Sequence, residues 1–173
     1  MRRASRSTRG VLMFAVALLG LFPSCNRKTI YNHYEHTPIV GWEKNDTLTF
    51  DVSPVRDSGI YYEELRLRTN GQYPFKGLSL VVEQTVLPLA YTHHDTLSCT
   101  LVDDNSNVKG KGVTSYQYNF HLTNLRLNKG DSLHICVRHN MKREILRGVA
   151  DVGLLLRKHA PLEPESPGAL GND

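Results

Sequence analysis

Eight histidines are the residues of this 173-residue chain that first suggest chemistry, because imidazole is a common metal ligand in proteins. His33 and His36 have a spacing seen in metal sites, but no set of cysteine or carboxylate partners accompanies them. His93 and His94 are adjacent, and adjacent residues of a strand point to opposite faces of the sheet. We therefore expect no metal site among the histidines.

A second candidate for chemistry is a polar segment that resembles a calcium loop. Asp103, Asn105 and Asn107 stand at its first, third and fifth positions, where oxygen ligands are needed. Val108 stands where the sharp turn of such a loop requires glycine. We therefore interpret this segment as a polar turn.

Familiar catalytic patterns are missing from the sequence. It contains no Gly-x-Ser-x-Gly nucleophile elbow and no glycine loop of the Walker type. The adjacent carboxylates Glu63 and Glu64 would diverge on a strand, which suits neither geometry of a glycosidase. The sequence therefore predicts a protein that has no catalytic residues and no cofactor.

The formal net charge of +4 comes from the first ten residues. Four arginines precede Gly10, and without them the remaining 17 basic residues equal the 17 acidic ones. A neutral remainder offers no basic surface for DNA or RNA, so we expect no nucleic-acid partner.

The segment after these arginines has the length of a signal-peptide core. Residues 11–22 are 12 uncharged residues, whereas a transmembrane helix needs about 20. Cys25 follows closely, and the whole segment resembles a bacterial lipoprotein signal, in which such a cysteine is lipidated. We expect a signal peptide over residues 1–24, then a lipid anchor at Cys25 and a polar tether over residues 25–44.

Alternating apolar residues, interrupted by turn residues, recur along the rest of the chain. Strands are expected at residues 47–52, 60–69, 78–87, 95–102, 116–122, 132–139 and 149–156. The pattern predicts an all-β fold, an antiparallel β-sandwich (jelly-roll or immunoglobulin-like) of about seven or eight strands over residues 45–158. For residues 141–147 the sequence allows two interpretations, one helical turn or a loop. Residues 159–173 contain three prolines and two glycines and are expected to be a disordered tail.

The two remaining cysteines are expected to be free thiols. Cys99 alternates with Leu97 and Leu101 and should face the core. Cys136 should face the opposite side of its strand, together with His134.

Aromatic residues suggest a sugar-binding surface, because sugars stack on exposed rings. The candidates are Trp42, Tyr61, Tyr73, Phe75, Tyr91 and Tyr116. Tyr116, Tyr118 and Phe120 alternate with polar residues as core residues do, so core packing is the competing interpretation. A glycan- or peptidoglycan-binding module is kept as the alternative function.

Three groups of segments resemble the gliding motility-associated lipoprotein GldH family of Bacteroidetes. They are residues 68–75 with 78–82, residues 95–97 with 101–103 and 109–112, and residues 138–142 with 146–154. Their order and spacing agree with the family from about residue 25 to residue 157, and the lipoprotein signal fits the same family.

The resemblance implies a lipid-anchored protein of the cell envelope that is no enzyme. The resemblance further implies that the protein supports gliding motility and/or the linked type IX secretion machinery through contacts with envelope proteins. Surface-exported lipoproteins of Bacteroidetes carry acidic residues after the cysteine, and residues 26–28 have none, so we expect the periplasmic face of the outer membrane. Residues from the matched segments are candidates for binding loops: Tyr73, Phe75, Asp103, Gly110, Gly112 and Asp151.

Overall fold

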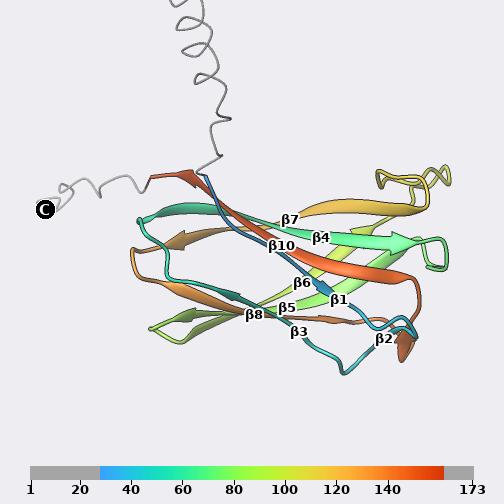
Figure 1. Cartoon of the computed structure of the whole chain (residues 1–173), viewed down its shortest axis with the longest axis horizontal. Coiled ribbons are helices and arrows are strands. Elements are labelled where there is room, and N and C mark those ends of the chain that lie inside the picture. The colour runs from blue at the N-terminus through green and yellow to red at the C-terminus, as the bar shows by residue number, and fades with distance from the viewer. Residues whose placement is uncertain (1–27, 162–173) are drawn as a thin grey trace, which may run out of the picture.

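The computed structural model describes residues 28–161, and this part of the chain forms ten β-strands and no helix (Figure 1). The strands are β1 (Thr29–His36), β2 (Trp42–Glu43), β3 (Leu48–Val52), β4 (Gly59–Asn70), β5 (Gly77–Leu87), β6 (Tyr91–Thr100), β7 (Ser115–Leu127), β8 (Ser132–His139), β9 (Ile145–Leu146) and β10 (Val149–Ala160). The expected signal peptide, Cys25 and residues 162–173 of the expected tail lie outside the described residues.

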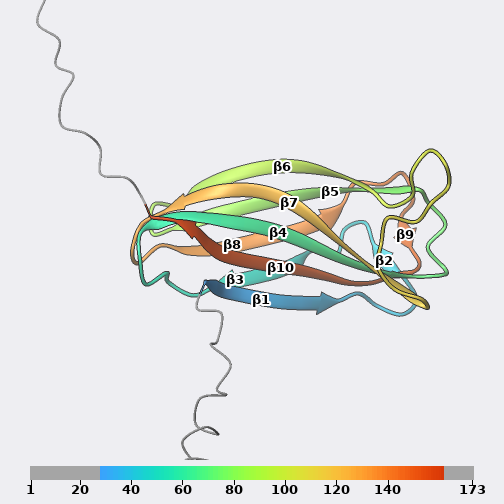
Figure 2. The same ribbon diagram turned by 90° about the horizontal axis from the view of Figure 1, so that it is seen from above.

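The eight longer strands form two antiparallel sheets that pack face to face (Figures 1 and 2). The strand order is β1-β10-β4-β7 in the first sheet and β3-β8-β5-β6 in the second. The short strands β2 and β9 pair with each other beside one end of the sandwich. The predicted all-β antiparallel sandwich is therefore confirmed, with two short strands beyond the predicted number.

Alternation along the strands places apolar side chains between the sheets. Leu65 and Leu67 of β4 are fully buried, while Arg66 between them lies on the outer face. Leu80 of β5 and Ile135 of β8 are buried on the inner face of the second sheet. Each such burial contributes roughly 1.5–3 kcal/mol, so this two-sided apolar layer holds the sheets together.

Strand β1 corrects the expectation of a tether over residues 25–44. Residues 29–36 pair with β10 along their whole length, from Thr29 opposite Arg157 to His36 opposite Asp151. The strand lies at the edge of its sheet, and no residue of it is fully buried. Backbone pairing stabilises strand β1, and few of its side chains are buried. Its sequence therefore has no alternation of apolar residues from which the strand could be predicted.

Other strand ends also differ from the expectation. Strand β6 begins at Tyr91 and β10 continues to Ala160, so the start of the expected tail is strand. These extensions carry mostly polar, exposed residues that only the backbone ladder holds in place. Within residues 141–147, the pair Ile145–Leu146 forms β9 and the remainder is loop.

The turn between β4 and β5 begins at Asn70 and Gly71, and neither residue has a positive φ. The side-chain Oδ1 of Asn70 accepts a hydrogen bond of 2.9 Å from the backbone N–H of Gln72. The asparagine thus closes the turn through its side chain.

The expected free thiols are confirmed for both cysteines of the described residues. Cys99 is buried on the inner face of β6, whereas Cys136 is partly exposed on the outer face of β8. The Cys136 Sγ lies 3.4 Å from Nε2 of His134, its expected neighbour on that face.

The sandwich has two ends with different connections (Figures 1 and 2). We call one the loop end; it comprises β2, β9 and the connections 37–41, 71–76, 101–114 and 140–148. We call the other the N-terminal end; it comprises Lys28 and the connections 53–58, 88–90 and 128–131. The strands run between these ends, so the two sets of connections are separated by the length of the sandwich.

Candidate functional site

All six predicted binding-loop residues lie at or beside the loop end. Tyr73 and Phe75 lie in the β4–β5 turn, and Asp103, Gly110 and Gly112 lie in the β6–β7 connection. Asp151 is the third residue of β10. The candidate functional site is therefore the loop end, where these two connections and the start of β10 lie.

Tyr73 and Phe75 form a packed turn. Their rings meet edge to face with centroids 5.7 Å apart, and the Tyr73 hydroxyl donates a 2.9 Å hydrogen bond to the carbonyl of Gly77. Burial raises the pKa of the Tyr73 hydroxyl. Gly148 has a φ of 85°, and a Cβ there would lie 2.2 Å from the backbone nitrogen of Tyr73. The β9–β10 turn thus packs directly against the β4–β5 turn.

Two glycines allow the β6–β7 connection to pack closely against neighbouring atoms. A Cβ at Gly110 would lie 2.6 Å from the ring of Tyr118, so the loop lies flat on that ring. Gly112 has a φ of 146°, and a Cβ there would collide with the carbonyl oxygen of Ser115. Both positions require glycine for close packing.

Asp103 closes the polar turn that the sequence predicts. Its carboxylate accepts hydrogen bonds from the backbone N–H of Asn107 at 2.8 Å and from the Asn107 amide at 3.1 Å. These bonds lower the pKa of Asp103. The oxygens that a calcium ion would use therefore already hold the turn together.

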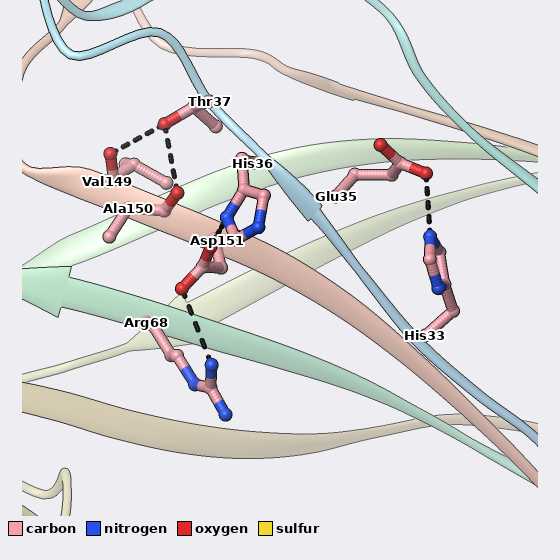
Figure 3. A network of polar contacts seen from close by, with 8 residues as sticks. All are labelled: His33, Glu35, His36, Thr37, Arg68, Val149, Ala150 and Asp151. Carbon is pink, nitrogen blue, oxygen red and sulfur yellow. Dashed lines mark hydrogen bonds and ion pairs between the residues drawn. The ribbon is translucent and has the colours of Figure 1, made fainter.

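Asp151 belongs to a polar cluster on the outer face of the first sheet (Figure 3). Its carboxylate is hydrogen-bonded to Nδ1 of His36 and lies 3.6 Å from Nη1 of Arg68. The guanidinium of Arg68 also lies 4.0 Å above the ring of Tyr34. That ring covers Gly153, where a Cβ would be 2.6 Å away. The cluster thus fastens edge strand β1 to β10 and β4.

A basic groove at the loop end was not foreseen from the sequence. It has a volume of about 650 Å³ and lies between the β4–β5 turn and the β8–β9 connection. Its lining residues are Gln72, Pro74, Phe75, Lys142, Arg143, Glu144, Ile145 and Arg147. Three of them are basic and one is acidic, so the groove carries a positive charge. The two segments are some 70 residues apart, and only the fold brings them together.

A second groove of about 520 Å³ lies between the β6–β7 connection and the first half of β7. Its lining residues are Thr100, Lys109, Lys111, Gln117, Tyr118, Asn119 and Phe120. The rings of Tyr118 and Phe120 are nearly parallel, with centroids 6.3 Å apart. This groove combines aromatic rings with amide and ammonium groups.

Exposed apolar side chains surround these grooves. The large ones at the loop end are Ile39, Val40, Val108, Val113 and Ile145. Ile39 is fully exposed and Val113 is 89% exposed. Apolar groups beside basic ones are typical of a surface that meets another protein.

Two of the six aromatic candidates for sugar binding, Trp42 and Tyr61, are buried, which corrects the expectation that Tyr61 is exposed; Tyr73, Phe75 and Tyr116 are half-buried. Trp42 packs against His139 and its indole N–H donates to the carbonyl of Asp46. Tyr61 is 1% exposed and its hydroxyl donates to the carbonyl of Asp57. Of the six candidates only Tyr91, at 64% exposure, offers a free ring, and it lies at the N-terminal end.

Within residues 28–161, no group of three or more His, Cys, Asp or Glu side chains could hold a metal ion. No helix in the described part of the chain is long and apolar enough to cross a membrane.

Comparisons with solved structures give only weak likenesses. Eiger TNF from S. frugiperda aligns with 83% of this chain and 100% of its own at 15% identity, with a TM-score of 0.34. The GH115 4-O-methyl-α-glucuronidase BtGH115A aligns with 80% of this chain and 19% of its own at 13% identity, with a TM-score of 0.40. Scores at this level support no argument about function.

Comparisons of sequence are more informative. The model of the GldH lipoprotein family matches residues 29–156. The gliding motility lipoprotein GldH of Flavobacterium johnsoniae is 30% identical over 86% of this chain and 95% of its own length. A GldH homolog of Christiangramia forsetii is 24% identical over 88% of this chain and 98% of its own length. The matched residues run from β1 nearly to the end of β10, so the chain belongs to the GldH lipoprotein family.

Proposed function

We propose that this protein is anchored in the cell envelope by a lipid on Cys25 and supports gliding motility or the linked type IX secretion machinery through protein contacts at its loop end. Membership in a lipoprotein family, with relatives named for gliding motility, supports a membrane-anchored envelope protein. The lack of acidic residues at positions 26–28 favours the periplasmic face of the outer membrane.

The observation that carries this proposal is the basic groove beside exposed apolar residues at the loop end. Lys142, Arg143 and Arg147 are exposed, and none forms an ion pair with another described residue. Ile145 projects beside them with half of its surface exposed. The chain enters the sandwich near the opposite end, so an anchor on Cys25 leaves this groove directed away from the membrane.

The groove indicates the chemistry of the partner. Unpaired basic groups attract acidic side chains and speed association, while apolar contacts at the centre of an interface supply most of the affinity. We therefore expect a protein whose contact segment places acidic residues on either side of an apolar one.

Charge reversal at the loop end tests the proposal. The double variant Lys142→Glu and Arg143→Glu should abolish cross-linking in cells to an envelope protein and should reduce spreading or secretion. The matched control is Arg126→Glu with Arg138→Glu, which makes the same charge change at exposed positions of strands β7 and β8, outside the loop end. Equal amounts of acylated protein must be present in each strain. Unchanged partner recovery and spreading in the loop-end variant would reject the proposal.

The groove over β7 favours the alternative function, a glycan- or peptidoglycan-binding module. Its lining combines the half-buried ring of Phe120 with the amide groups of Gln117 and Asn119, and rings and amides are side chains that hold sugars in binding sites. We would prefer this function to the proposed one if the protein bound purified peptidoglycan fragments, and if Phe120→Ala abolished the binding while Lys142→Glu left it intact. No binding at millimolar ligand would reject the glycan-binding function.

A further inference from the structure

We propose that the hairpin between β5 and β6, residues 87–91, docks into the lipid surface that holds the Cys25 anchor. This inference rests on the anchor proposed above and adds a second, noncovalent contact with the membrane. The contact would fix how the sandwich stands on the bilayer.

The hairpin presents apolar side chains to solvent. Leu87 is 41% exposed, Leu89 is 78% exposed and Tyr91 is 64% exposed. Pro88 has no backbone N–H to donate, and Ala90 has a φ of 50°, so the chain reverses tightly and Leu89 stands at the tip. Apolar residues at the tip and a tyrosine beside them match the side chains that enter the interface of a bilayer.

The position of the hairpin agrees with that of the anchor. The hairpin and the start of β1 lie at the same end of the sandwich (Figures 1 and 2). Only two residues separate Cys25 from Lys28, and a fully extended chain covers about 10 Å over this interval. Because β1 leaves no long tether, the N-terminal end must lie close to any membrane that holds the lipid.

Charge at this end favours an anionic lipid surface. Lys28, Arg56 and Lys129 are exposed, and no ion pair among the described residues involves them. The nearby carboxylates are already engaged, because Asp57 pairs with Lys158 at 3.5 Å and Asp131 is buried and accepts from the N–H of Asn128. Unpaired basic groups beside an apolar tip bind anionic headgroups while the tip enters the acyl region.

The lipid surface is the occupant that this end of the sandwich already has beside it. The chain from Cys25 to Lys28 reaches about 10 Å, so the corner where β1 begins lies within about one layer of secondary structure of the lipid. The hairpin lies at the same end but at the opposite edge, beside β6, so a tilt of the sandwich brings it to the same surface. Docking there requires no additional component.

Fluorescence quenching by lipids tests the docking directly. The full acylated chain carrying Leu89→Trp is placed in vesicles of phosphatidylethanolamine and phosphatidylglycerol, with and without bromine on the acyl chains. The native Trp42 is buried at the loop end and serves as a constant background. The matched control is Val113→Trp, at an apolar residue of the loop end that is 89% exposed. Should Leu89→Trp fail to fold by circular dichroism, Tyr91→Trp reports on the same hairpin.

Docking predicts that bromine reduces the emission of the Leu89→Trp protein and leaves that of the Val113→Trp protein unchanged. Equal emission of the Leu89→Trp protein in both kinds of vesicle overturns the inference. Mass spectrometry of the N-terminal peptide and flotation with the vesicles are measured on the same sample. Acylated, floating and unquenched protein would leave the proposed anchor standing and reject the docking alone. An unmodified Cys25 would reject both.

Discussion

Replacing Glu63 with glutamine should remove most of the dependence of stability on pH. Glu63 of β4 is fully buried between the sheets, and Gln84 of β5 is 1% exposed on the facing layer. Neither the carboxylate oxygens of Glu63 nor the amide atoms of Gln84 have a hydrogen-bond partner among the described residues. Burial raises the pKa of Glu63 from 4.5 to about 8; the nearby amide of Gln84 opposes the rise and the charge of Asp95 adds to it.

The raised pKa sets both the sign and the size of the effect. Between pH 4.5 and pH 8 the unfolded chain has lost the Glu63 proton while the folded chain keeps it, so each rise in pH favours unfolding. The slope is about 1.4 kcal/mol per pH unit for one proton. Between pH 5 and pH 8 the fold therefore loses on the order of 4 kcal/mol, a large share of the roughly 5–15 kcal/mol of a typical domain.

Urea unfolding of the wild type and the Glu63→Gln variant at pH 5, 6, 7 and 8 measures this loss. The difference between the two free energies of unfolding isolates Glu63, because every other titrating group contributes to both proteins. We expect near-equal stability at pH 5 and a variant more stable by about 4 kcal/mol at pH 8. The matched control Glu43→Gln makes the same substitution at an exposed position of β2.

A constant difference between Glu63→Gln and the wild type from pH 5 to pH 8 would refute this reasoning. It would mean that Glu63 is charged in the fold throughout this range, and that the interior supplies partners for a carboxylate. A difference of the opposite sign, with the variant losing stability as pH rises, would refute it equally.

Three further predictions concern the turns, the thiols and the short N-terminal link. Gly148→Ala should destabilise the fold by at least about 2 kcal/mol in urea unfolding, because it forces alanine into positive φ against the backbone of Tyr73, whereas Gly71→Ala, with nothing near its Cβ, should be nearly neutral. Thiol titration of the mature, acylated chain should find Cys136 in the folded state and Cys99 only after unfolding, since burial raises the pKa of Cys99 to about 12. A flexible 20-residue insertion directly before residue 28 should leave acylation intact and should lower spreading or secretion.

The sequence predicted strands where one face of a strand meets the core. Leu65 and Leu67 alternate with arginines because one face of their strand packs in the core and the other faces solvent. This alternation can be recognised from the sequence alone. Strand β1 has no such contrast, because it is an edge strand whose pairing with β10 uses backbone groups common to every residue. Its existence depends on a partner more than 100 residues away, which no local pattern encodes.

The candidate site was predictable only in part for a related reason. Tyr73, Asp103 and Gly110 were recognised in segments that resemble a family, and the fold does bring them to one end. Each of them also holds its own turn or loop together, and binding through them stays a prediction. The basic groove could not be foreseen, since it exists only where the segments around Phe75 and Arg143 meet.

Strand β1 occupies part of the segment expected to be a tether, and this limits how far the sandwich can move from the membrane. Strands β4 and β10 each contain 12 residues, which at ~3.3 Å per residue span about 40 Å. A long tether would let the loop end sample many heights above the lipid, whereas strand β1 begins four residues after Cys25. In the proposed arrangement, the anchor and the docked hairpin hold the N-terminal end of the sandwich at the membrane. The continuous strands then keep the basic groove at a fixed distance from the membrane. The rigid sandwich then acts as a spacer, so a partner must present its acidic and apolar contact segment about 40 Å from the membrane.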